Sequence, residues 1–527
     1  MIFKRFFAAL TAVLLCVSFA GCNETFAPTA EKNDKPQQTV SKTDVMQLLY
    51  SASDSFNPYT AVTAINRELC KLLYDPLVKT DNNFNPSYSL ASNAVIEGVK
   101  CTVTIKDAKF TDGSAVTADD VVYSCNLAKG SGGVYASSLY EVASVTAADS
   151  KTVVFTLTRQ DPYFLNLLDF PIIKSGSDKT ADIDGVVQPP VGCGRFKLND
   201  KLDTLIRNDS YYGKHTSIPK IRLINSPDGE SVSHYVEVGA TDAYFTDVSN
   251  GNIVRMSGKK CDVNLNDFVY IGINDSVGLL KIGEIRYAIS SAIDRSGICK
   301  TAYYNNAVAA TGFFNPAFSP TSAVQTLKNV SDFEIAIENL EKIGYNRLDN
   351  DGYRINSSGY RLTFNLLVNS ENESRKTAAY MIAEQLKNIG IYIRVNEQPY
   401  ANYMALLNAG SFELYLGEIR VLNNMDISPL VVSGGSVAYG VSKAEPKPKD
   451  DASVEQSAAV ATIDEIYGAF YSGSGSIADV ASILLTQLPV IPVCYREGLL
   501  FYDDGVCDLS GASLSDIYFS IEADNRQ

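Results

Sequence analysis

The stretch Asn266–Tyr304, NDFVYIGINDSVGLLKIGEIRYAISSAIDRSGICKTAYY, indicates a strand followed by two helices. Its apolar, aromatic run from Phe268 to Ile273 is short and rich in β-forming residues, which predicts a buried strand. Asp294 can cap a short second helix through Ile298, since its carboxylate can accept from the free N–H groups of a first turn. The first helix is predicted from apolar residues at steps of three and four: Ile285, Ala288, Ile289, Ala292 and Ile293. Because the stretch holds no catalytic apparatus, we interpret it as leading out of one lobe, through a hinge, into another.

Length and charge limit the classes of protein that this chain can belong to. With 527 residues it is too long for one core and should divide into two or three domains. Its net charge of -15 argues against nucleic acid as a partner, because a net acidic surface repels phosphates. The two histidines, His215 and His234, have no partners at metal-binding spacing, so we interpret both as structural or exposed. We expect no metal site and no cofactor.

No sequence motif supports catalysis. HExxH and paired CxxC motifs are absent from the sequence. The run Gly473-Ser474-Gly475 lacks the third glycine and the following Lys-Ser/Thr of a nucleotide loop, so we predict a turn there. A Ser-His-Asp or Cys-His site stays open, because such partners meet only in space. We therefore expect that the protein is not an enzyme.

The N-terminus has the composition of an export signal. Lys4 and Arg5 precede an apolar run over residues 6–19, which small residues follow. A basic start, a run too short for a confident membrane span and small residues before a cut describe a secretory signal.

Residues 19–22, FAGC, resemble the lipobox of bacterial lipoproteins, with Phe19 where Leu is usual. The resemblance implies that residues 1–22 are a signal peptide with a lipobox and that Cys22 is lipidated and becomes the mature N-terminus. The alternative is an ordinary signal peptide with an incidental cysteine. Residues 23–43 are polar, contain proline and are short of apolar side chains, so we interpret them as a flexible tether between lipid and body.

Eight further cysteines are scattered singly through apolar contexts. Their even number in an exported protein is compatible with disulfides, but a chain of this length does not need them. We favour buried free thiols, which would suit a reducing habitat. The eight are Cys70, Cys101, Cys125, Cys193, Cys261, Cys299, Cys494 and Cys507.

The first half of the body is rich in predicted strands. Strands are expected at Val45–Tyr50, Val99–Ile105 and Thr152–Leu157, where apolar residues alternate or cluster. Thr117 is predicted to cap a helix with Asp120 at its third position. Apolar residues at helical spacing predict an earlier helix and include Ile65, Leu69, Leu72 and Leu73.

Beyond Tyr304 the pattern alternates between β and α. Strands are predicted at Leu362–Val368 and Ile391–Val395, and the helix between them is expected to begin at a Ser370/Glu373 capping box and to stop at Gly390. A crossover of this length implies parallel pairing and an α/β lobe. Further elements are expected at Tyr400–Asn408 (helix), Phe412–Leu416 (strand) and Val490–Tyr495 (strand). We interpret the polar insert Val441–Ser457 as an exposed loop, with a basic interaction patch as the alternative.

Six motifs in order resemble those of the extracytoplasmic solute-binding proteins of the peptide/nickel group, also called family 5, which feed ABC importers. Together they extend over most of the body. They are LLYDPLVKTD (residues 72–81), AKFTDGSAVTADDVVYS (108–124), TVVFTLTRQDPYFLNLL (152–168), VGCGRFKL (191–198), RNDSYYGKHTSIPKIRL (207–223) and the opening stretch with IRYAISSAIDRSGI.

This resemblance implies an α/β, two-lobed periplasmic-binding-protein-like fold of type II. Hinge strands should join the lobes, and the last strand should return to the first lobe. We expect a discontinuous lobe I (44–55, 187–265 and 490–527), an extra small subdomain in it (56–186) and lobe II (266–489). A ligand cleft between two such lobes can close at low cost if only a few backbone angles change.

The family is known for binding extended peptides through backbone hydrogen bonds, and the resemblance implicates three regions in ligand binding. The first is the loop with Ser55, Phe56 and Asn57. The second contains Tyr270 and Gly272, where an aromatic ring and a bare glycine could flank a ligand backbone.

The third region, GEIRVLNNMDISPL from Gly417, departs from the better-known pattern. Peptide binders often show Gly-Trp and then an Asp that pairs with the ligand's amino group, and neither follows Gly417 directly. Asp426 could replace that Asp, while Arg420 could grip a carboxylate with two hydrogen bonds. The alternatives are a salt bridge of Glu418 and Arg420 to each other or to a neighbour, and a helix cap by Asp426. With no Trp, the candidate stacking rings are Tyr270, Tyr415 and Tyr439, each of which could equally be core or rim.

We therefore expect a lipid-anchored, extracytoplasmic, monomeric solute-binding protein that delivers a short peptide or similar polar solute to the transmembrane subunits of an ABC permease. The alternative ligands are a metal chelate or an oligosaccharide. Alternatives from other classes are a surface receptor or adhesin that does not transport, and a secreted hydrolase.

Overall fold

The computed structural model describes residues 45–248, 254–442 and 461–521. The predicted signal peptide, Cys22, the tether and most of the Val441–Ser457 insert lie outside these residues. Among the described helices, none is long and apolar enough to cross a membrane.

The first lobe is built on a four-stranded sheet in the order β1-β10-β9-β8. The predicted first strand is confirmed as β1 (Val45–Tyr50), which pairs in parallel with β10 (Lys220–Asn225). The two remaining strands, β9 (Thr204–Arg207) and β8 (Phe196–Leu198), are antiparallel to their neighbours. Leu69, Leu72 and Leu73 of α1 (Ala64–Leu73) are buried, as the helical spacing predicts.

A second four-stranded sheet forms a small subdomain, in the order β4-β5-β7-β6. The capping box of Thr117 and Asp120 is confirmed at the start of α2 (Ala118–Gly130). Two of the strands match predicted segments, β5 (Lys100–Ile105) and β7 (Thr152–Leu157). The other two strands are β4 (Ala91–Glu97) and β6 (Val142–Ala147). The same part of the chain also contains β2 (Val78–Thr80), β3 (Pro86–Tyr88) and α3 (Val134–Ser138), which are not strands of this sheet.

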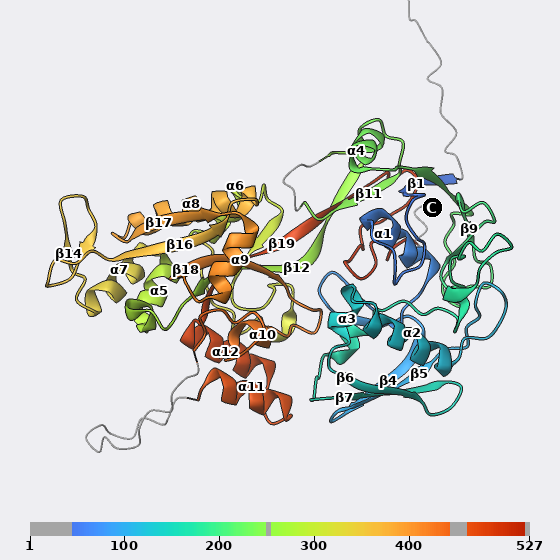
Figure 1. Cartoon of the computed structure of the whole chain (residues 1–527), viewed down its shortest axis with the longest axis horizontal. Helices are drawn as coiled ribbons and strands as arrows, with labels where there is room; N and C mark the ends of the chain where they lie inside the picture. Colours follow the sequence, from blue (N-terminus) through green and yellow to red (C-terminus); the bar gives the residue numbers. More distant parts are fainter. Residues whose placement is uncertain (1–44, 249–253, 443–460, 522–527) are drawn as a thin grey trace, which may run out of the picture. The chain divides into compact units, whose positions relative to one another are not determined.

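Two long antiparallel strands of a third sheet connect the core of the first lobe to a second, separate core. The predicted strand from Phe268 is the second half of β12 (Lys259–Ile273), which pairs along its length with β19 (Val490–Tyr502). At one end of β19, Leu500 and Tyr502 pack in the first-lobe core, and at the other, Ile491 packs in a separate core. The strands lie side by side between these cores (Figure 1), which is the course expected of hinge strands.

The third sheet has the order β11-β19-β12-β18-β16-β17. The predicted crossover is confirmed: β16 (Thr363–Asn369) and β17 (Tyr392–Gln398) are parallel and α8 (Glu373–Lys387) joins them. The predicted Ser370 cap is wrong, because the side chain that accepts from the first turn is that of Asn372. The remaining strands are β11 (Ala243–Thr246), β18 (Leu414–Arg420) and β13 (Ala307–Ala309), which pairs with β19.

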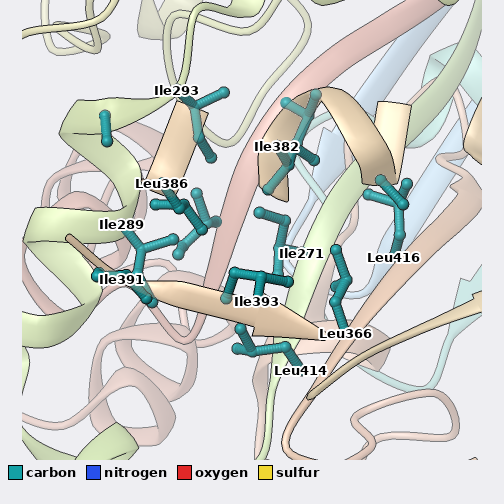
Figure 2. Packing of buried hydrophobic residues seen from close by; sticks show 14 of the residues in the cluster. Ile271, Ile289, Ile293, Leu366, Ile382, Leu386, Ile391, Ile393, Leu414 and Leu416 are labelled. Atoms are coloured by element: carbon teal, nitrogen blue, oxygen red, sulfur yellow. The ribbon is translucent and has the colours of Figure 1, made fainter. Parts of the chain in front are cut away.

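Helices cover both faces of this sheet. On one face, Ile289 of α5 (Gly283–Ala292) and Ile382 of α8 pack with Ile271 and Leu416 in a hydrophobic core (Figure 2). The predicted cap is confirmed, because Asp294 accepts from Gly297 N at the start of α6 (Arg295–Thr301). The core on the other face includes residues of α9 (Tyr400–Asn408), α11 (Ile463–Tyr471) and α12 (Ile477–Gln487).

The remaining elements are short or peripheral. They are α4 (Gly229–Glu237), α7 (Phe333–Lys342), α10 (Ser428–Val431), β14 (Arg347–Leu348), β15 (Arg354–Ile355) and the 3-10 turns η1 (Phe164–Leu167), η2 (Ser177–Lys179), η3 (Gly278–Lys281) and η4 (Ser319–Thr321).

The eight body cysteines are free thiols, as we favoured. Seven are buried and Cys261 is half-buried. Burial raises the pKa of the Cys101 thiol to about 12, so this group stays protonated at neutral pH.

Candidate functional site

The predicted ligand loop belongs to the first lobe and is braced by its own hydrogen bonds. Phe56 is 5% exposed and stacks on Tyr50 with ring centroids 5.8 Å apart. The Ser55 hydroxyl accepts from Asn57 N at 2.8 Å, and Asn57 Oδ1 accepts from Tyr59 N at 2.9 Å. These contacts hold a turn, and the ligand role of the loop stays a prediction.

Tyr270 and Gly272 lie on β12, where they fit the side chains of the neighbouring strand β18. Tyr270 is 2% exposed and meets Tyr415 edge-on, with ring centroids 5.8 Å apart. A Cβ on Gly272 would lie 1.9 Å from Tyr415 Cε1, and one on Gly417 would lie 2.6 Å from Tyr270 Cζ. Each glycine therefore makes room for a tyrosine ring of the opposite strand. Their contact with a ligand stays a prediction.

Arg420 takes part in an ion-pair network across β12, β18 and β19. It pairs with Asp267 through two nitrogens, one of them Nη2 at 3.0 Å from Oδ2. Arg496 reaches the same carboxylate at 3.3 Å and Glu418 at 2.7 Å, and Arg375 of α8 lies 3.6 Å from Glu418. The salt bridge to a neighbour that we weighed for Arg420 is therefore present. Whether Arg420 also binds a ligand remains a prediction.

The central carboxylate of this network is Asp267, with a side chain only 7% exposed, whereas that of Arg420 is 47% exposed. Burial is the largest influence on the pKa of Asp267 and raises it, while Arg420 partly offsets the rise. Arg420 is thus the member of the network that faces solvent and retains donors for an anionic group.

Asparagine side chains join segments that are distant in sequence near these strands. Asn82 in the β2–β3 turn accepts from Asn264 N on β12 at 2.8 Å. Asn166 of η1 donates to Asn423 O at 3.0 Å, and Asn423 donates to Thr80 Oγ1 at 3.3 Å. Because each amide both donates and accepts, these side chains can satisfy the backbone of a facing segment.

Asp426 lies in the segment after β18 and already has three partners. Arg159, just after β7, places Nη2 2.6 Å from its Oδ2. Its Oδ1 accepts from Tyr471 OH at 2.8 Å and from Ser428 N at 2.9 Å. The last bond joins Asp426 to the first residue of α10, but the N-cap of this helix is Ile427 and has no side-chain cap bond, so Asp426 is not the cap. A ligand contact by Asp426 stays a prediction.

The structure brings part of the predicted set together. Asp267 of β12 is directly opposite Arg420 in the strand register, and Tyr270 and Gly272 follow on the same strand. Phe56 lies instead in the first-lobe core. Sequence reasoning missed Arg159 and the asparagines, although the repeated amides of NNFN (82–85) and NN (423–424) are a visible signal.

Among the described residues, no group of three or more His, Cys, Asp or Glu side chains is placed to hold a metal ion.

The family model for bacterial extracellular solute-binding proteins, family 5 (Middle) matches residues 86–430. The chain belongs to this family. The predicted resemblance is thereby confirmed, and this solute-binding protein contains the two-lobed α/β fold that the resemblance implies.

Relatives and solved structures agree with the assignment. The solute-binding protein is 25% identical over 432 residues to the oligopeptide-binding protein AppA of Bacillus subtilis, covering 76% of this chain and 77% of AppA. A structure of AppA with a nonapeptide has a TM-score of 0.54 at 20% identity, covering 90% of this chain and 98% of that one. A nickel ABC transporter structure from Bacillus halodurans has a TM-score of 0.69 at 19% identity, covering 87% and 95%.

Proposed function

We propose that this solute-binding protein is the extracytoplasmic substrate-binding component of an ABC importer, and that it captures short peptides between its lobes. The match to the family model over residues 86–430 carries the proposal. The relative named as an oligopeptide-binding protein favours a peptide ligand. Transmembrane permease subunits would be the partner, a monomer the working form, and lipidated Cys22 the membrane anchor.

Binding between lobes can be sensed by a permease if the ligand prefers one arrangement of the lobes. A ligand shifts such an equilibrium only through its differential affinity for the two states. The long strands β12 and β19 run from one core to the other, and in this mechanism they are the connection about which the lobes move.

A metal chelate is the second candidate ligand, because one similar structure is named as a nickel transporter. A thermal-shift screen of the protein against mixed short peptides, sugars and nickel chelates separates the possibilities. A ligand at a hundred times its Kd should stabilise the protein by about 2.7 kcal/mol. If varied peptides gave no shift while one chelate or sugar did, the peptide assignment would fail.

Ser55, Phe56, Asn57, Tyr270, Gly272, Arg420 and Asp426 remain the proposed ligand residues. Arg420 offers the sharpest test, because its side chain is 47% exposed beside a buried carboxylate. We expect Arg420→Ala to weaken peptide binding about tenfold, equivalent to about 1.4 kcal/mol, through loss of a charged hydrogen bond. Isothermal titration of wild type and variant measures it.

Arg361 provides the matched control, because it is 42% exposed and forms ion pairs with the nearby Asp349 and Asp351. Arg361→Ala should leave affinity unchanged. Unchanged affinity of Arg420→Ala, together with lowered stability, would assign Arg420 to the ion-pair network alone.

A further inference from the structure

A segment of the small subdomain and two segments of the second lobe are joined by side-chain contacts at Arg159. This residue follows β7, whereas its partner Asp426 follows β18 and lies 267 positions further along the chain. The Arg159 guanidinium also stacks over the ring of Tyr471 on α11, 3.8 Å from its centroid. A cation that has both a carboxylate and an aromatic face is held from two sides.

The same guanidinium is tied to its own subdomain. Arg159 Nε lies 3.1 Å from Glu141 Oε1, next to β6. The side chains of Arg159 and Asp426 are 28% and 13% exposed, so water screens their pair less than a surface pair. Arg159 therefore bridges an anion of the subdomain and an anion of the second lobe.

Three further contacts flank this bridge. The amide of Asn424 donates to Asp161 Oδ2 at 2.8 Å, and Gln160 Nε2 donates to Ser472 O at 3.3 Å. Tyr163 meets Phe318, a member of the second-lobe core, edge-on at 5.2 Å. All of these residues on the subdomain side lie within residues 159–163. We call the contacts of residues 159–163 with Phe318, residues 424–426 and residues 471–472 the interlobe clasp.

The interlobe clasp is separate from the strands that connect the cores. β12 and β19 run from one core to the other without a break, so they keep the cores connected during a hinge movement. The clasp consists only of non-covalent contacts between segments distant in sequence. Moving the subdomain away from the second lobe must break the Arg159–Asp426 pair.

We propose that Arg159 is the central residue of the interlobe clasp and holds the small subdomain against the second lobe. This inference goes beyond the proposed function, because it concerns movement of the lobes without any ligand. The ion pair and the ring contact of Arg159 stabilise the joined arrangement. A ligand that enters between the lobes does so after this pair has parted.

Small-angle X-ray scattering of the full chain without ligand tests the proposal. Arg159→Gln keeps a long polar side chain but removes the charge, and Asp426→Asn removes the opposite charge. Both variants should show a larger radius of gyration than wild type. The swapped pair R159D/D426R should return it part of the way to the wild-type value, because the pair is restored with reversed sign while the new carboxylate at position 159 lies beside Glu141.

Arg207→Gln is the matched control. Arg207 pairs with Asp209 two positions away, so its loss cannot release one lobe from the other, and its radius of gyration should equal that of wild type. Circular dichroism checks that each variant is folded. If Arg159→Gln does not fold, Asp426→Asn answers the same question, because it removes the second-lobe charge of the same pair.

Folded Arg159→Gln and Asp426→Asn with the wild-type radius would overturn the clasp. The peptide thermal-shift screen is read separately, so the two proposals can fail independently. Expansion of the variants without any peptide binding would uphold the clasp and reject the peptide function. Peptide binding with no expansion of the variants would uphold the peptide function and reject the clasp.

Discussion

At the scale of single residues, Gly272 shows how a predicted ligand position can have a packing role that the sequence does not reveal. Its lack of a side chain admits the ring of Tyr415, whose Cε1 would lie 1.9 Å from an added Cβ. In the sequence, Tyr270 close to Gly272 suggested a ligand contact. That both residues pack against the opposite strand follows only from the pairing of β12 with β18.

Gly272→Ala should therefore destabilise the protein by about 1–3 kcal/mol, because the Tyr415 ring must leave its position. Chemical denaturation monitored by circular dichroism measures the change. Gly468→Ala in α11 is the control, since an added Cβ there meets nothing within 4 Å. That substitution should be neutral or slightly stabilising, as alanine favours a helix over glycine. Equal stabilities of the two variants would contradict the packing role.

Asp161 gives the molecule a predictable response to pH. Burial raises its pKa from 3.8 to about 6, although the Asn424 amide works in the opposite direction. The folded state thus holds the proton more tightly than the unfolded chain, so this contribution to stability is complete below pH 3.8 and is lost as pH rises through about 6.

We expect Asp161→Asn to abolish the loss of stability that Asp161 causes as the pH rises. The stability of the variant relative to wild type should rise by about 2–3 kcal/mol between pH 3.5 and pH 7. Urea denaturation at a series of pH values checks it. A difference that stays constant with pH would show that the carboxyl group is not perturbed in the folded protein.

At the scale of elements, α8 shows where pattern reasoning succeeds and where it stops. Helical spacing located the helix, but it ends at Lys387, three residues before the predicted stop at Gly390, whose φ is 82°. The choice of cap failed because Ser370 and Asn372 are both good capping residues, and only the path of the chain out of β16 decides which one meets the free N–H groups. Asn372 Oδ1 accepts from Arg375 N at 2.8 Å.

Asn372→Ala should accordingly cost about 1 kcal/mol of stability through loss of the cap. Ser370→Ala is the paired control and should change the free energy of unfolding little, since the Ser370 side chain does not cap α8. Thermal or denaturant unfolding of both variants provides the comparison. A larger loss for Ser370→Ala would restore the original prediction.

At the scale of the whole molecule, buried charges tie the C-terminal part of the chain to the first lobe. Asp516 pairs with Arg195 at 2.7 Å and with Lys79 at 3.0 Å, and Lys79 also reaches Asp75 at 3.1 Å. Burial opposes ionisation of Asp516, but Arg195 and Lys79 lower its pKa overall. The pKa of Asp75 is lowered as well, because Lys79 and Arg195 outweigh the effect of burial.

Asp516→Asn should destabilise the first lobe by about 3–5 kcal/mol, because it removes the buried carboxylate that pairs with both Arg195 and Lys79. The contribution of Asp516 in wild type is present above pH 3.8 and is lost as pH falls through its lowered folded pKa. Scanning calorimetry at neutral pH measures the shift. Asp504→Asn, which breaks the exposed pair with Lys259, should have little effect.

The sequence by itself determined the family, the position of most strands and helices, and the strand at Phe268 that becomes part of a hinge. These features depend on short-range spacing and on motifs, which a single chain displays directly. Only the tertiary structure decided the partners of Arg420 and Asp426. Asp267 lies 153 positions from Arg420, and Arg159 lies 267 positions from Asp426. Which charges pair depends on how segments far apart in the sequence pack together. Local sequence patterns do not reveal such contacts.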